Sequence, residues 1–99
     1  MKFIVIFTSG ANADVAEIFE YYESIRVGLG EDFLTKLNLA ENRLRRFPLA
    51  NRILEKNVRR ALLDRFPHGI FYRVENRTVV VFTVCDLRRD PSIWKNRVE

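Results

Sequence analysis

The sequence predicts a single α+β domain over residues 1–99, with an N-terminal strand, a two-helix hairpin and then a three-stranded, mainly antiparallel sheet. This prediction rests on a change in the spacing of apolar residues between the two halves of the chain. The first half holds two apolar stripes with the three- and four-residue spacing of helices, and the second half holds short β-branched runs separated by turn residues. With 47% hydrophobic residues, the chain can bury a core without a disulfide, which its single cysteine could not form.

The chain begins with an expected strand at residues 2–8 (KFIVIFT), which are apolar and β-branched over the length of one strand. A helix is expected from Ala13, because the apolar positions that follow recur on one helical face. Ser9 or Asn12 could cap its start. Its glutamates at positions 17, 20 and 23 are expected on the solvated side.

The second helix is separated from the first by Gly28 and Gly30, which allow a sharp turn. Its apolar stripe begins at Phe33 and ends at Phe47, and Pro48 stops the helix. Two amphipathic helices joined by a short turn predict a hairpin that shares one core.

Three strands are predicted in the second half, at residues 58–63, 69–74 and 78–85, after a polar connector at 48–56. The run VVVFTV in the last strand is apolar on both faces, which is typical of a strand covered on each side. Pro91 is expected to end that strand, and the large Trp94 is expected to fold back onto the sheet or the hairpin.

The charge is distributed unevenly along the chain. Residues 1–42 hold three basic and seven acidic side chains, a net charge of −4, and the remainder carries +8. This segregation favours one basic face that meets an anionic partner, although solvation of a small surface is the simpler alternative. The apolar start is too short for a signal peptide and no run is long enough to span a membrane, so we expect a cytoplasmic protein with no membrane partner.

Most enzyme signatures are missing from the sequence, including phosphate-binding glycine loops and HExxH. The one histidine, His68, has no assignable partner for base catalysis and is interpreted as a loop residue packing near Tyr72. Cys85 is interpreted as a small core residue. We therefore predict no metal site, no cofactor and no catalytic residue from these motifs.

Arginines form the remaining candidate site. Some of them are expected to converge on one side of the sheet, where guanidinium groups could bind phosphate: Arg43, Arg45, Arg46, Arg59, Arg60, Arg65, Arg88 and Arg89. The alternative is a structural network in which carboxylates neutralise them, pairing Asp64, Asp86 and Asp90 with Arg65, Arg88 and Arg89.

Two blocks of sequence resemble the RelE/ParE superfamily of toxins from bacterial type II toxin–antitoxin systems. They are VRRALLDRFPHGIFYRV (58–74) and VVVFTVCDLRRDPSIW (79–94), and the helical half agrees through YYE and LGEDFLTKL. The RFP-x-G-I-x-Y and RRDP-x-x-W segments are most similar to the ParE-like branch, which includes plasmid stabilisation proteins. The resemblance covers nearly the whole chain and implies the two-helix-on-sheet fold already predicted.

The resemblance also separates two activities. RelE-like members cut mRNA on the ribosome with a strand arginine, whose position is occupied here by Gly69, and with a terminal base whose position falls on Trp94 or Lys95. ParE-like members trap DNA gyrase without that catalytic set. They often carry a histidine where Asp86 stands, and the sequence assigns no consequence to this departure.

The resemblance therefore implies a ParE-like toxin that inhibits gyrase by protein–protein contact, is neutralised by a cognate antitoxin, and meets promoter DNA only through that antitoxin. Its expected target- or antitoxin-binding residues are Arg59, Arg60, Arg65, Arg88, Arg89, Trp94 and Lys95. One alternative is a RelE-like endoribonuclease acting on mRNA at the ribosome through Arg60, Arg65 and Arg89. Another is a non-toxic binding module.

Overall fold

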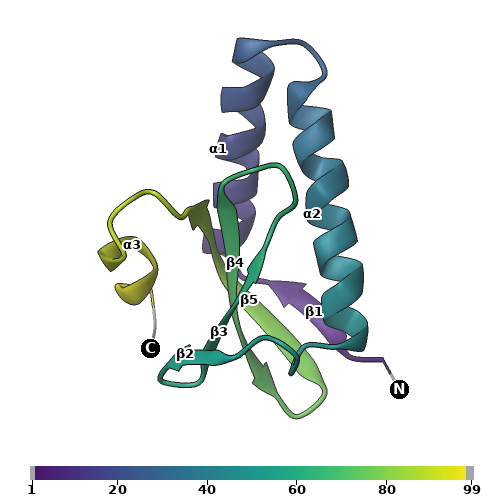
Figure 1. The fold of residues 1–99 in the computed structure, drawn as a ribbon, viewed down its shortest axis with the longest axis vertical. Coiled ribbons are helices and arrows are strands. Elements are labelled where there is room, and N and C mark those ends of the chain that lie inside the picture. Colours follow the sequence, from purple (N-terminus) through teal and green to yellow (C-terminus); the bar gives the residue numbers. More distant parts are fainter. Residues whose placement is uncertain (1, 98–99) are drawn as a thin grey trace.

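The chain folds into a helical hairpin packed against one face of a five-stranded sheet, in a computed structural model that describes residues 2–97. Figure 1 shows the two long helices side by side, with a short third helix on the other flank of the sheet. The elements are β1 (Ile4–Phe7), α1 (Ser9–Ile25), α2 (Leu29–Arg46), β2 (Ile53–Glu55), β3 (Val58–Leu62), β4 (His68–Glu75), β5 (Thr78–Asp86) and α3 (Ser92–Lys95). The predicted α+β class is confirmed.

The sheet has the strand order β1-β5-β4-β3-β2, so the prediction of a three-stranded sheet is wrong. β1 joins the sheet at its edge, parallel to β5, with Ile4 opposite Thr78, whereas the other pairs are antiparallel. The missed strand β2 lies in the expected polar connector, and at three residues it is too short to show an alternating pattern.

Helix α1 begins four residues earlier than expected, at Ser9 instead of Ala13. Thr8 is its cap, because the Thr8 hydroxyl accepts a hydrogen bond from the Ala11 N–H at 3.2 Å. Ser9 and Asn12 lie inside the helix, so the predicted caps are wrong.

The turn between the helices depends on Gly28 and Glu23. Gly28 has a φ of +93°, a left-handed conformation that favours glycine. The Glu23 carboxylate accepts hydrogen bonds from the N–H groups of Gly28 and Gly30, at 3.0 and 2.9 Å. Glu23 therefore closes the hairpin, and the expectation that it is simply solvated is wrong.

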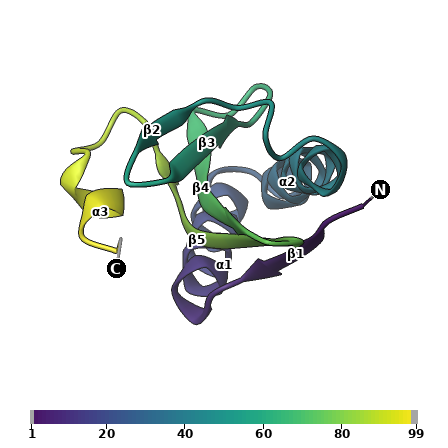
Figure 2. The same ribbon diagram turned by 90° about the horizontal axis from the view of Figure 1, so that it is seen from below.

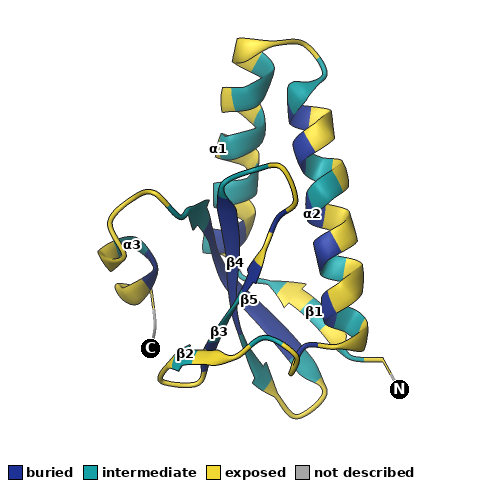
Figure 3. Ribbon diagram, in the orientation of Figure 1, coloured by how far each residue is buried: buried dark blue, intermediate teal, exposed yellow. Residues whose placement is uncertain are grey.

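The larger core lies between the hairpin and the sheet, and is called here the helix-face core. Figure 3 shows its buried positions along α2 and the central strands. Its buried members are Ala11, Phe33, Leu37, Ala40, Leu44, Ala61, Leu63, Ile70, Tyr72, Val79, Val81 and Val84. The stripe of α2 is buried as predicted, whereas α1 contributes the buried Ala11 and the partly buried Val15, Ile18 and Tyr22.

A second and smaller core lies on the opposite face of the sheet. This tail-face cluster consists of Val58, Phe71, Phe82 and Trp94. β5 supplies both cores because successive side chains point to opposite faces, as Val81 and Phe82 do. Its register shifts at a bulge, where Phe71 lies opposite Thr83 and Tyr72 opposite Val81. The prediction that β5 is covered on both faces is confirmed.

Candidate functional site

The C-terminal tail packs onto the sheet through Trp94. Its ring stacks on Phe71 with centroids 4.8 Å apart and planes 16° from parallel. Lys95 Nζ lies 5.7 Å from the Trp94 ring centroid and 3.4 Å from a carboxylate oxygen of Glu55 on β2. The expected folding back of Trp94 is confirmed, with the sheet as its partner. Figure 2 shows α3 on the far side of the sheet from α2.

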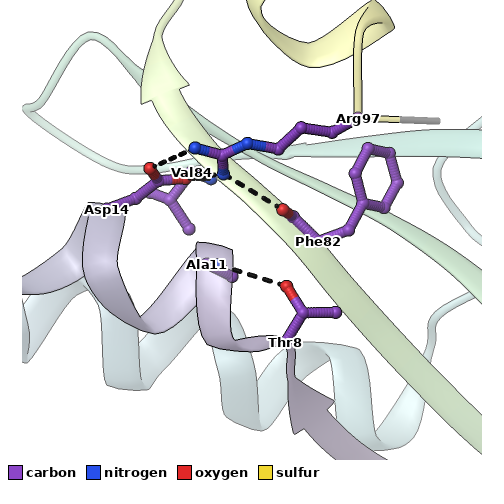
Figure 4. Close-up of polar contacts among 6 residues, drawn as sticks. All are labelled: Thr8, Ala11, Asp14, Phe82, Val84 and Arg97. Carbon is purple, nitrogen blue, oxygen red and sulfur yellow. Dashed lines mark hydrogen bonds and ion pairs between the residues drawn. The ribbon is translucent and has the colours of Figure 1, made fainter.

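The tail is also tied to the helical hairpin by Arg97, which the sequence did not single out as a site residue. Figure 4 shows its guanidinium between the Asp14 carboxylate of α1 and the Phe82 carbonyl. The Arg97 nitrogens lie 2.6 and 2.9 Å from the two Asp14 oxygens, and 3.3 Å from the Phe82 oxygen. Asp14 also accepts from the Val84 N–H at 3.0 Å, so one carboxylate joins α1, β5 and the tail.

The segment before α3 differs from the prediction. Strand β5 ends at Asp86, five residues before Pro91, so Pro91 does not end the strand but caps α3. The side chain of Asp90 accepts a hydrogen bond from the Ser92 N–H at 2.9 Å, which stabilises the first turn of this short helix.

The predicted arginines do not converge on one surface. Arg59 lies on the helix side of the sheet, opposite Tyr72, and donates to the backbone carbonyls of Leu49, at 3.3 Å, and Asn51. The Tyr72 hydroxyl donates to the Pro48 carbonyl in the same region, at 2.5 Å. Arg59 therefore fixes the connector between α2 and β2.

Arg60 lies on the other face, opposite Phe71 of the tail-face cluster, and Arg89 lies just beyond β5, near Cys85. We call this surface the tail face and define it by Arg60, Gly69, Leu87, Arg89, Trp94 and Lys95. Arg60 and Leu87 both pack over Gly69. Arg89 lies close enough to act electrostatically on Cys85, a half-buried residue that packs against the tail-face cluster.

Gly69 lies beneath two flexible side chains, which would have to shift to admit a larger residue. A Cβ placed there would lie 2.7 Å from Leu87 Cδ2 and 3.2 Å from both Cγ and Cδ of Arg60. The first distance is shorter than real Cβ contacts, so any larger residue at position 69 would displace Leu87.

Arg88 points away from the tail face, toward the end of α1. Its guanidinium holds Asp86 in a two-pronged pair, with Nε–Oδ1 at 3.0 Å and Nη2–Oδ2 at 2.6 Å. The hydrogen bonds from Arg88 lower the pKa of Asp86 to about 2. The Arg88 charge also acts on Tyr22 of α1.

The alternative of a neutralising arginine–carboxylate network holds for one pair of the three. Asp86 binds Arg88, but Asp64 pairs with Lys36 at 3.3 Å, and Asp90 binds the start of α3. Arg89 has no carboxylate within ion-pair distance among residues 2–97. The tail face therefore keeps an unneutralised arginine.

Arg65 belongs to a separate surface hollow of about 420 Å³ at the turn end of the hairpin. It lies in the loop between β3 and β4 with a left-handed φ of +69°. The hollow is lined by Arg26, Leu29, Asp32, Thr35, Lys36, Arg65 and Phe66. Arg65 is thus on the helix side, apart from Arg60 and Arg89.

His68 is a buried residue at the start of β4 and not a loop residue beside Tyr72, so that interpretation is wrong. Its ring lies edge-on to Tyr22 and Phe33, with centroids 5.8 and 5.4 Å away. Burial lowers the pKa of His68, and its Nδ1 has no hydrogen-bond partner in the described chain. The imidazole therefore faces the helix-face core and cannot serve the tail face.

Two kinds of feature are absent from residues 2–97. No three histidine, cysteine or acidic side chains lie close enough together to hold a metal ion. None of the helices is long and apolar enough to cross a bilayer.

Solved structures that share this fold include two from toxin–antitoxin systems. The chain is similar to a protein in a chromosomal ParDE toxin–antitoxin system from Pseudomonas aeruginosa, with a TM-score of 0.76 and 16% identity over 85% of this chain and 95% of that one. It is also similar to a chain of the toxin–antitoxin complex RelBE2 from Mycobacterium tuberculosis, with a TM-score of 0.59 and 22% identity over 87% and 99%. Comparison with curated proteins gave no match.

These likenesses show that the chain shares its fold with both proteins. Residues 5–91 match a family model described as the ParE toxin of the type II toxin–antitoxin system parDE. The chain belongs to this ParE toxin family.

Proposed function

We propose that this ParE-family toxin inhibits DNA gyrase by protein–protein contact through its tail face, and that it catalyses no reaction itself. The observation that carries the proposal is the packing at Gly69. Leu87 and Arg60 fill the place where the related nucleases carry a strand arginine. The one histidine is buried on the other side of the sheet, where it cannot replace a base on the tail face.

Contact with a protein target fits the composition of the tail face. Arginine is enriched among the residues that dominate interface energies, and the tail face carries Arg60 over Gly69 and the exposed Arg89. An intracellular target such as gyrase would also require the expected cytoplasmic location.

The experiment is a supercoiling assay with relaxed plasmid, ATP and the purified, antitoxin-free chain. The proposal expects linear DNA to accumulate with dose, and expects Arg60→Ala with Arg89→Ala to reduce this effect at least tenfold. Arg88→Ala is the control, because it removes the neighbouring charge, which points to α1, and leaves the tail face intact. Equal losses in both variants would remove the tail face as the contact.

The RelE-like alternative is tested in parallel by adding the chain to a translating extract. Arg60 and Arg89 share one face and could stabilise charge on RNA, which is the observation in its favour. Cleaved mRNA together with unaffected gyrase would replace the proposal. Normal growth of cells producing the folded chain without an antitoxin would instead favour a non-toxic binding module.

We also propose a cognate antitoxin that covers the edge strand β1, with sequence-specific promoter binding left to the antitoxin. β1 has a neighbour on one side only, and its side chains Ile4 and Ile6 are 63% and 47% exposed. Such an apolar edge is suited to an added strand. Ile4→Lys with Ile6→Lys should weaken antitoxin binding at least tenfold, while Ile53→Lys, on β2 at the opposite edge, should not.

A further inference from the structure

A second basic surface lies at the carboxyl end of α2, away from the tail face. It surrounds a hollow of about 520 Å³ lined by Lys2, Asn42, Arg43, Arg45, Arg46 and Phe47, which we call the helix-end patch. The backbone holds it together, because the Phe3 N–H donates to the Arg45 carbonyl at 2.8 Å. Figure 1 places this end of α2 near the N-terminus, across the molecule from α3.

The cations of the helix-end patch are mostly unneutralised. Within residues 2–97 the one carboxylate paired with them is Glu41, which binds Arg45. The exposed side chains of Arg43 and Arg46 have no acidic partner in this range, and no carboxylate lines the hollow. The patch therefore presents a net positive charge to solvent.

Stabilisation of the helix end does not account for so many cations. A cation near a helix carboxyl terminus contributes about 0.3–1 kcal/mol through the helix dipole. Two carbonyls of the last turn are already satisfied, since those of Arg43 and Arg45 accept from the N–H groups of Phe47 and Phe3. Lys2, which comes from a different segment, adds further charge to the same hollow.

We infer that the helix-end patch binds the phosphate backbone of duplex DNA, independently of sequence. Guanidinium groups suit phosphate oxygens, and Arg43 and Arg46 lie one helical turn apart on the same face of α2. The hollow has one apolar lining residue, Phe47, so it lacks the apolar pockets that anchor a peptide. A single aromatic also falls short of the stacking surface that single strands use.

This contact goes beyond the proposed action on gyrase and uses different residues. It departs from the expectation that the chain meets promoter DNA only through its antitoxin. The antitoxin would supply sequence recognition, and the helix-end patch would add a backbone contact that depends on salt.

Fluorescence anisotropy of a labelled 20-base-pair duplex, titrated with the antitoxin-free chain at 50 and 200 mM salt, tests the inference. Arg43→Gln with Arg46→Gln should weaken binding at 50 mM salt at least tenfold and reduce the logarithmic salt slope by about 2. The control, Arg26→Gln with Arg65→Gln, removes the same charge at the opposite end of the hairpin and should stay within twofold. Circular dichroism confirms that each variant is folded.

Three results would overturn the inference. They are the absence of duplex binding by the unmodified chain at 50 mM salt, equal weakening in both double variants, and tighter binding of a single-stranded RNA or a poly-glutamate peptide than of the duplex. The variant Arg60→Ala with Arg89→Ala should keep DNA binding, so that a failure of the gyrase proposal can be told apart from a failure here.

Discussion

The two faces of the sheet are covered in different ways. The helix-face core draws buried residues from both long helices and from β3, β4 and β5, so many contacts would have to break together. The tail-face cluster has four buried residues and is covered by the four-residue helix α3. Global stability should therefore depend on the first face, while the second can be altered locally and is suited to contact with other molecules.

The largest effect should come from the helix-face core. Phe33 is fully buried and its ring lies 5.4–5.9 Å from those of Tyr22, Phe66 and His68. Phe33→Ala should lower the free energy of unfolding by about 3–5 kcal/mol, because it removes burial and leaves a cavity. Urea denaturation measures this loss. A value below about 1 kcal/mol would contradict the claim that global stability depends on the helix-face core.

The next effect should come from Trp94, and it should be local. Trp94→Ala removes the stack on Phe71 and should cost about 2–3 kcal/mol, less than Phe33→Ala because the short α3 can detach while the sheet persists. Hydrogen exchange should then lose protection in residues 92–97 and keep it in α1 and α2. Trp94→Phe should retain most of the protection. Loss of protection throughout the chain would mean that the two faces unfold as one unit.

The link between the two faces is Asp14, and its removal should have a moderate effect. Asp14→Asn leaves Arg97 without its charged partner and should cost about 1–2 kcal/mol. A double-mutant cycle with Arg97→Gln measures the coupling directly. A coupling energy near zero would show that the tail is held by Trp94 alone.

The smallest effect should be a pH dependence that originates in the helix-face core. Burial lowers the pKa of His68, so the imidazole binds a proton more readily in the unfolded chain than in the folded one. The contribution of His68 to the free energy of unfolding should be fully present above pH 6.5. It should decrease below that pH by at most about 1.4 kcal/mol per pH unit. His68→Leu should flatten the curve between pH 7 and 5, measured by urea midpoints. An unchanged slope would place the titrating group elsewhere.

The sequence was sufficient for the elements that have a clear period. Six elements were predicted because each buries a face at regular spacing. The two amphipathic stripes predicted α1 and α2, and the apolar start predicted β1. The runs at 58–63, 69–74 and 78–85 predicted β3, β4 and β5. It failed for β2 and α3, which have three and four residues and therefore show no period. The start of α1 was misplaced because the Thr8 cap sits where the strand was expected.

The candidate site was harder to predict, since clustering depends on which face of a strand each residue takes. Arg59 and Arg60 are adjacent in sequence, yet one binds the α2–β2 connector and the other packs over Gly69. Arg88 and Arg89 are also adjacent, yet Arg88 lies close to Tyr22 of α1 and Arg89 lies close to Cys85 of β5. No local pattern indicated Arg97, because its partner Asp14 is 83 positions away.

The pairing of β1 with β5 has a consequence for the order in which the toxin matures. The first strand finds its neighbour only after β5 has been synthesised, and the clamp between Asp14 and Arg97 joins residues 83 positions apart. Contacts so distant along the chain form late in folding. A nascent chain on the ribosome thus keeps an unfinished sheet until β5 has emerged, and its tail stays unclamped until Arg97 has emerged as well.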